Sequence, residues 1–187
     1  YGIWLTPSLA KSINGIAIGI IGPDVPCNMP ESATQTSNGL NLQVITNGLF
    51  IPLVAIAEAP LSKYYRGYHS DSSIKAEADS ILSATTYPST HNGLELAAFG
   101  TTTARVNGVS VSPWASQHIS MNGLAVNGIW NVFLKSNGIS IAAVNSSLSV
   151  KGTQIGIINQ TIKLKGLQFG LWNRNEKRSL PLVNWDF

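Results

Sequence analysis

Charged side chains are scarce in this chain, at 11% of its 187 residues against about a quarter in typical domains. A single cysteine, Cys27, excludes an internal disulfide and any metal cluster held by several cysteines. No apolar run is long enough to form a membrane-spanning helix. Because 44% of the residues are apolar, there is material for a core, and the surface must consist largely of Ser, Thr, Asn and Gln. This composition favours extended β-structure at the cell exterior or in an envelope over a cytosolic enzyme.

The chain contains a short repeat that begins with Asn-Gly or Lys-Gly. From residue 92 onward the pairs recur every 15 and then every 14 residues, at Asn92-Gly93, Asn107-Gly108, Asn122-Gly123, Asn137-Gly138, Lys151-Gly152 and Lys165-Gly166. Less regular copies begin at Asn14, Asn38 and Asn47, and Tyr1-Gly2 resembles a degenerate copy. A unit this short cannot close a core alone and must stack on its neighbours.

The positions within each unit predict which side chains are buried. Counting the first residue of the pair as position one, positions three, five and eight are apolar in nearly every unit. Positions three and five share one face of an extended strand, and a bend at the small residues that follow would return position eight to the same interior. We therefore predict a repeat core of Leu96, Val111, Val126, Ile141, Ile155, Phe169, Trp114 and Trp172.

A strand, a bend, a second short strand and a corner describe one coil of a β-solenoid. Asn-Gly suits the corner because both residues tolerate positive φ. The predicted fold is therefore all-β: a β-helix-like solenoid with coils of about 14–15 residues, in a single domain spanning residues 1–187. The alternatives are an antiparallel β-meander, since Asn-Gly also forms type I′ hairpins, and a small β-barrel.

Two insertions interrupt the repeat, at about residues 22–37 and 55–91. The first is rich in Pro, Ser and Thr, which is typical of a loop. In the second, apolar residues from Ile74 to Leu82 fall at helical spacing, and Asp71 or Ser72 can cap the start. We predict a short amphipathic helix that lies across an open side of the solenoid.

The same insertion carries a cluster of aromatic residues. Tyr64, Tyr65, Arg66 and Tyr68 form a candidate partner-binding patch, because Tyr and Arg are favoured at recognition surfaces. The alternative is that these tyrosines pack under the predicted helix and serve only the fold.

No residue pattern indicates catalysis, a metal or a cofactor. The three histidines lack an Asp, Glu or Cys at metal-ligand spacing, and no serine lies in a Gly-x-Ser-x-Gly motif. Within the regular units the acids are Glu95 and Glu176, which would stand roughly 20 Å apart, too far to act as a pair. Basic residues from Lys135 onward have no interleaved aromatic residues, which argues against nucleic-acid binding. We expect no enzyme activity, no cofactor and no metal.

The closing segment is the most specific stretch of the chain. It reads Lys-Gly-Leu-Gln-Phe-Gly-Leu-Trp-Asn-Arg-Asn-Glu-Lys-Arg-Ser-Leu-Pro-Leu-Val-Asn-Trp over residues 165–185. This segment resembles a group of uncharacterised exported proteins of Bacteroidetes bacteria with surface repeats of the GLQIGLxN kind, also called leptospiral-type surface repeat proteins. The resemblance extends over most of the chain apart from residues 55–91. It implies an exported protein of a Gram-negative envelope, and it carries over no catalytic residue.

These observations together predict a non-enzymatic cell-envelope repeat protein that acts as a structural and protein-binding module. One form of this role is an accessory or plug subunit of an outer-membrane complex, with other envelope proteins as partners and membrane contact left open. The chain is expected in the periplasm, in the outer membrane or at the cell surface. The alternatives are a glycan-binding surface module and a small outer-membrane β-barrel.

Overall fold

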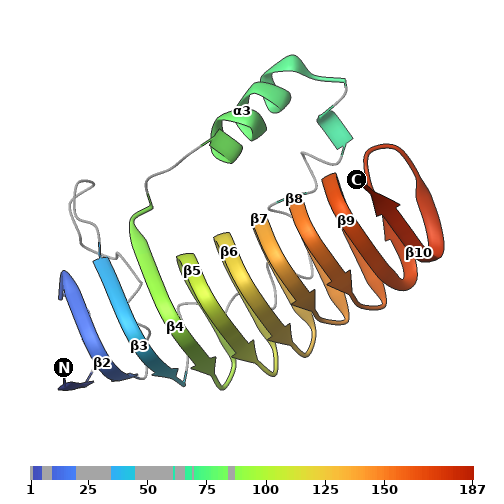
Figure 1. Ribbon diagram of the computed structural model, residues 1–187. Coiled ribbons are helices and arrows are strands. Elements are labelled where there is room, and N and C mark those ends of the chain that lie inside the picture. Colours follow the sequence, from blue (N-terminus) through green and yellow to red (C-terminus); the bar gives the residue numbers. More distant parts are fainter. Residues whose placement is uncertain are drawn as a thin grey trace.

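The computed structural model describes residues 2–5, 10–19, 35–44, 61, 66–68, 70–83 and 87–187. Within these residues ten strands form one sheet whose spatial order follows the chain (Figure 1). The strands are β1 (Gly2–Leu5), β2 (Ser12–Gly19), β3 (Gln35–Gln43), β4 (Ser89–Ala97), β5 (Gly100–Ser112), β6 (Ala115–Asn127), β7 (Trp130–Ile141), β8 (Val144–Ile155), β9 (Ile158–Arg174) and β10 (Ser179–Asp186).

The strands β1 to β9 pair in parallel, with equivalent repeat positions side by side. Asn38 of β3 pairs with Asn14 of β2 and with Asn92 of β4, and Lys151 of β8 pairs with Lys165 of β9. This register confirms the β-solenoid and excludes the antiparallel meander. Only β10 runs antiparallel, against β9. The copy expected at Asn47 lies outside the described residues.

The glycine of each pair forms the corner between two segments of a coil. Gly123, for example, has a φ of 128°, in the region that side-chain-bearing residues rarely adopt. A Cβ atom built on this glycine would overlap the carbonyl oxygen of Gly108 in the preceding coil. Both the corner geometry and the close stacking of coils therefore require glycine here, as the sequence predicts.

The predicted repeat core is wrong, because its side chains point out of the coil. Ile155 and Phe169 are each 40% exposed, Trp114 is 38% exposed and Trp172 is 50% exposed. The other members are half-buried, namely Leu96, Val111, Val126 and Ile141. The residue that precedes each fifth-position side chain is instead fully enclosed: Glu95, Ser110, Ala125, Ser140, Gln154 and Gln168 are all 0% exposed.

Many of the polar side chains in the lumen bond to their equivalents in the next coil. The Nδ2 atom of Asn131 donates a 2.7 Å hydrogen bond to Oδ1 of Asn145, and Asn145 donates in turn to Asn159 at 2.8 Å. Gln168 donates to Gln154 at 2.8 Å in a second ladder. A buried amide with partners on both sides escapes the penalty for burying a polar group. The buried amides of these ladders therefore have hydrogen-bond partners inside the lumen.

Apolar residues also line part of the lumen, on both sides of the Asn-Gly corner. Val106, Met121, Ala125 and Phe133 form one buried cluster. The ring of Phe133 stacks on His118, with centroids 5.2 Å apart and an interplanar angle of 19°. The interior thus combines apolar packing in some rows with hydrogen-bonded ladders in others.

The helix α3 (Ser72–Ser83) lies along one side of the stack (Figure 1). Oδ1 of Asp71 accepts a hydrogen bond from the backbone N–H of Ser73 at 2.8 Å and a longer one, at 3.4 Å, from that of Ile74. Hydrogen bonds from Ser73 to its carboxylate lower the pKa of Asp71. Both the predicted helix and its cap are confirmed.

The helix covers the outer side of the later coils. Ala78, which is 0% exposed, packs in a cluster with Leu61, Tyr68, Leu148 of β8 and Ile162 of β9. Residues 22–34 and 55–60 of the two expected insertions lie outside the described residues. Within the described part of the chain, no helix combines the length and the apolar character needed to cross a bilayer.

Candidate functional site

Two rows of side chains point outward from the strand segment that follows each Asn-Gly or Lys-Gly corner. One is the row of third positions, formed by Ile3, Ile16, Leu40, Leu94, Val109, Leu124, Ile139, Thr153, Leu167 and Trp185. The other is the row of fifth positions, formed by Ile18, Leu42, Leu96, Val111, Val126, Ile141, Ile155, Phe169 and Val183. We call these two rows the apolar face.

The apolar face is continuous and free of charge. Thr153 is its one polar residue. Its most exposed members range from Ile16, at 36%, to Ile3, at 70%, and the remainder are half-buried because equivalent side chains on adjacent strands flank them. Ten strands spaced by about 4.8 Å make the face about 43 Å long. Contiguous exposed apolar surface of this kind marks an interaction site far more often than isolated apolar side chains do.

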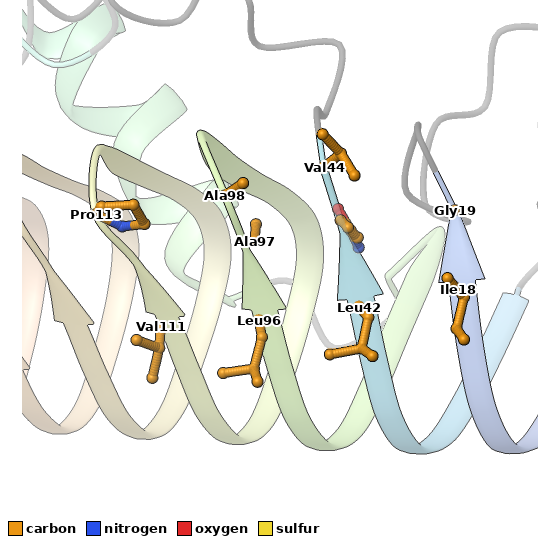
Figure 2. A pocket seen from close by; sticks show the side chains of 10 residues that line it. Ile18, Gly19, Leu42, Val44, Leu96, Ala97, Ala98, Val111 and Pro113 are labelled. Carbon is orange, nitrogen blue, oxygen red and sulfur yellow. The ribbon is translucent and has the colours of Figure 1, made fainter.

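A groove of about 270 Å³ opens at one border of the apolar face, over β2 to β5. Figure 2 shows Ile18, Leu42, Leu96 and Val111 pointing the same way from four successive strands. The corner that follows these strands supplies the rest of the lining, including Val44 and the small residues Ala97, Ala98 and Pro113. The groove is therefore mainly apolar, with Gln43 as its one polar lining side chain, and its shape comes from large side chains on the strands beside small ones at the bend.

The two long margins of the apolar face differ in chemistry. One margin carries the first residue of each pair, and here Asn122 donates to Asn107, and Asn137 donates to Asn122, at 2.7 Å each. Lys151 and Lys165 continue that row in β8 and β9, and both are exposed. The opposite margin is a corner row of mainly apolar residues, namely Phe99, Trp114, Ile129, Ala143, Ile157 and Leu171.

The predicted partner-binding patch is only partly placed by the structure. Tyr64 and Tyr65 lie outside the described residues, and Arg66 is exposed. Tyr68 is 5% exposed, and its hydroxyl donates a 3.1 Å hydrogen bond to Oδ1 of Asp79 on α3. Tyr68 therefore packs under the helix, in line with the alternative interpretation, and is not available to a partner. A role for Arg66 stays a prediction.

Inside the lumen, hydroxyl and imidazole side chains gather around the carboxylate of Glu95. Thr103 donates a 2.7 Å hydrogen bond to Oε1 of Glu95, and Ser110 donates to Oε2 at 3.2 Å. Nε2 of His118 lies 3.9 Å from the same Oε2 atom. Glu95 and Ser110 are 0% exposed and His118 is 2% exposed. A serine, a histidine and a carboxylate thus meet, but they are sealed between coils where no substrate can reach them.

Burial controls the protonation of the two lumen histidines. Removal from water lowers the pKa of His118 to about 4, and it also lowers the pKa of His91. Assigning the ring proton of His118 to Nδ1 lets that nitrogen donate to the carbonyl oxygen of Thr103 at 2.9 Å. Nδ1 of His91 shares a 2.8 Å hydrogen bond with the hydroxyl of Ser37. Both histidines are therefore neutral at pH 7 and belong to the packing of the lumen.

Sequence reasoning missed the apolar face because it placed those rows inside. A signal for the true interior was present: Asn145, Asn159 and Asn173 recur at intervals of 14, and Gln154 and Gln168 do the same. Amides that repeat at the coil period are typical of hydrogen-bonded ladders, which need burial to be useful. Within the described residues, no three His, Cys, Asp or Glu side chains come together in a way that could hold a metal ion.

Comparison of this chain with protein-family models, with curated proteins and with solved structures found no match.

Proposed function

We propose that this protein is a non-enzymatic module of a Gram-negative cell envelope that docks by its apolar face onto an apolar surface of another protein. The observation that carries the proposal is the outward placement of two adjacent rows of side chains that are apolar except at Thr153, one across all ten strands and the other across β2 to β10. An exposed apolar surface of this extent is typical of an interaction site, where another surface covers it. The resemblance of the closing segment to exported envelope proteins supplies the expected compartment.

The size of the apolar face allows a large hydrophobic contribution to docking. A strip about 43 Å long and about 13 Å wide covers about 550 Å² on this chain. At about 25 cal/mol per Å², its burial contributes about 14 kcal/mol before the cost of association is subtracted. That cost is about 4–15 kcal/mol, so affinity depends on how closely the partner's shape matches the rows.

The construction of the solenoid suits a structural role. Ladders of side-chain hydrogen bonds join successive coils inside, and the strands are joined by a continuous parallel ladder of backbone bonds. The outward rows are therefore held at fixed spacing on a rigid support. We infer that the module acts as an accessory or plug subunit of an outer-membrane complex. Such a subunit needs a rigid surface of fixed shape and no catalytic group.

A glycan-binding module is less well supported by the same surface. Sugar recognition needs several hydrogen-bond donors and acceptors placed around aromatic rings. On the apolar face Thr153 is the one side chain with a hydrogen-bonding group apart from the indole N–H of Trp185. Docking onto a protein surface therefore fits the described residues better.

A charge placed in the middle of the face tests the proposal. Val126→Lys introduces an ammonium group into the fifth-position row of β6. The control, Gln117→Lys, introduces the same group at an outward position of β6 that precedes the Asn-Gly corner and is outside the apolar face. We expect the tagged chain to migrate in a complex during native size-exclusion of envelope extracts. The complex should persist with Gln117→Lys and disappear with Val126→Lys.

The measurement contradicts the proposal if the wild-type chain migrates alone, or if both variants keep or lose the complex equally. Circular dichroism and urea unfolding of the purified variants serve as controls for folding. Both substitutions are at outward positions, so each should leave the strand signal unchanged.

A further inference from the structure

We infer that the partner that covers the apolar face is a second copy of this chain, packed face to face with its solenoid axis reversed. This inference rests on the proposed docking function and names the partner. It follows from three properties of the face: its regular spacing, its area and the position of its lysines.

The first property is the regular spacing of the rows. Equivalent side chains repeat from strand to strand at one interval along the solenoid, about 4.8 Å. A surface with a constant interval is complementary to an identical surface, because the ridges of one copy can enter the grooves of the other along the whole length. Two packed sheets stand about 10 Å apart with interdigitating side chains. A second copy of this chain therefore has rows with the matching interval.

The second property is the area of the face. Burial of about 550 Å² on each copy removes about 1,100 Å² in total from water, which exceeds the threshold of about 1,000 Å² for a specific interface. The apolar corner row, with Phe99 at 54% and Leu171 at 66% exposure, adds to this area at one margin. The interface would be free of charged residues at its centre, as expected for a stable homodimer.

The third property selects the arrangement of the two copies. Turning one copy about the solenoid axis would place each strand over its own equivalent with the strand direction reversed. The row that contains Lys151 and Lys165 would then lie over the apolar corner residues Ile157 and Leu171 of the other copy. Ammonium groups facing exposed aliphatic side chains would lose water without gaining a partner.

Turning one copy about the strand direction gives a better match. This rotation places β5 over β6, β3 over β8 and β2 over β9, and each row meets the same row of the other copy. Lys151 and Lys165 then lie over Asn38 and Asn14, whose side chains are joined by a 2.8 Å hydrogen bond in an exposed polar ladder. Polar margin meets polar margin, and the lysines of the two copies are at opposite ends.

A cross-linking experiment tests both the dimer and its arrangement. Cys27→Ser provides a background without native thiols, and Ile18→Cys and Phe169→Cys are then made separately in the fifth-position row of β2 and β9. The reversed arrangement brings these two positions together across the interface. In a mixture of the two variants, a short thiol-to-thiol reagent should link them, whereas either variant alone should remain unlinked.

Within one copy the two substituted positions are seven strands apart, or about 34 Å, and the same distance separates like positions of two reversed copies. Linkage of the Ile18→Cys variant to itself would therefore overturn the reversed arrangement. Equal linkage by a control cysteine at Gln117, which is outside the face, would show non-specific association and overturn the inference as well.

The mass of the purified protein gives an independent readout. Light scattering over a range of concentrations should show a dimer whose dissociation constant rises at least about 100-fold with Val126→Lys, because the twofold axis lies between β5 and β6 and buries both charges. Gln117→Lys should leave the dissociation constant within about threefold, as outward substitutions do.

The remaining outcomes separate this inference from the proposed function. A chain that stays monomeric alone, yet joins a complex with a different protein in a manner abolished by Val126→Lys, would overturn the dimer and leave protein docking in place. Flotation with phospholipid vesicles that Val126→Lys abolishes would assign the face to a membrane and overturn both. A monomer in which neither variant changes any association would also overturn both.

Discussion

Asn145 donates a hydrogen bond from Nδ2 to Oδ1 of Asn159, which is fourteen residues later in the chain and one coil further along the solenoid, at 2.8 Å. The same amide group receives a bond from Asn131 at 2.7 Å on its other side. Both neighbours are buried at 0% exposure. The ladder therefore links consecutive coils through groups that have no water to replace a lost partner.

Removal of one step of this ladder should be costly. Asn145→Ala leaves an acceptor on Asn159 and a donor on Asn131 without their partner, and we expect the free energy of unfolding to fall by about 2–4 kcal/mol. Asn137→Ala is the matched control, because Asn137 is in the exposed ladder, where it donates to Asn122 at 2.7 Å and water can replace it. Urea unfolding should show a loss below about 1 kcal/mol for the control. Equal losses would mean that the lumen is hydrated.

Two adjacent residues provide a direct test of which side chains face inward. Gln154 is 0% exposed and Ile155 is 40% exposed. We expect Gln154→Ala to lower the unfolding free energy of the isolated chain by about 2–3 kcal/mol, because Oε1 accepts a bond from Gln168 at 2.8 Å. Ile155→Ala should cost less than about 1 kcal/mol. Denaturant unfolding at several protein concentrations separates these values from any effect of association, and the reverse order would place the apolar rows inside.

The lumen histidine should make stability depend on pH. The folded pKa of His118, about 4, is below its ordinary value of 6.5, so the unfolded chain binds the proton more readily. Stability is then complete above about pH 6.5 and falls as the pH decreases towards 4, by up to about 3 kcal/mol. Burial has the largest effect on the pKa of His118, even though Glu95 lies 3.9 Å away. The neighbouring His91 also lowers the pKa of His118.

The measurement is urea unfolding at pH 7 and at pH 4.5 for the wild type and for His118→Gln. The variant is expected to lose stability at pH 7, because Thr103 loses a hydrogen-bond partner, but to show a clearly smaller difference between the two pH values. An unchanged pH dependence would show that the pKa of His118 is the same in the folded and the unfolded chain, which would contradict the prediction.

The helix α3 should detach without unfolding the solenoid. Ala78 is 0% exposed between the helix and the outer side of β8 and β9, so Ala78→Glu places an unpaired carboxylate in that contact. We expect hydrogen exchange over residues 70–83 to accelerate by at least about 100-fold, while the strands stay protected. Glu77→Ala, at an exposed position of the same helix, is the control. Loss of strand protection in Ala78→Glu would show that the helix is required for the stack.

The repeat interval and the glycine corners could be predicted from the sequence because both are local and strict. Asn-Gly pairs mark each coil, and the parallel register places them side by side. The inward face could not be derived in the same way. Apolar residues normally define a core, but here the amides of Asn145 and Gln154 gain partners only through stacking with identical coils. These hydrogen bonds exist only between stacked coils, so the sequence of a single unit does not reveal them.

The candidate site was missed for the same reason, since Val126 and its row were placed in the interior. The tyrosine patch illustrates a different limit: an aromatic cluster predicts burial and recognition equally well. For Tyr68 the burial of the ring and the hydrogen bond to Asp79 decide in favour of packing.

The reversal of direction at β10 changes how this edge of the sheet can pair with another strand. A tenth parallel strand would present another copy of the same template to any neighbouring molecule, and end-to-end growth into fibres would follow. In β10 the backbone instead runs against β9, its register slips between Leu180 and Leu182, and Pro181 between them offers no N–H group. These features make β10 a poor template for a further parallel strand, which limits growth of the sheet at this edge.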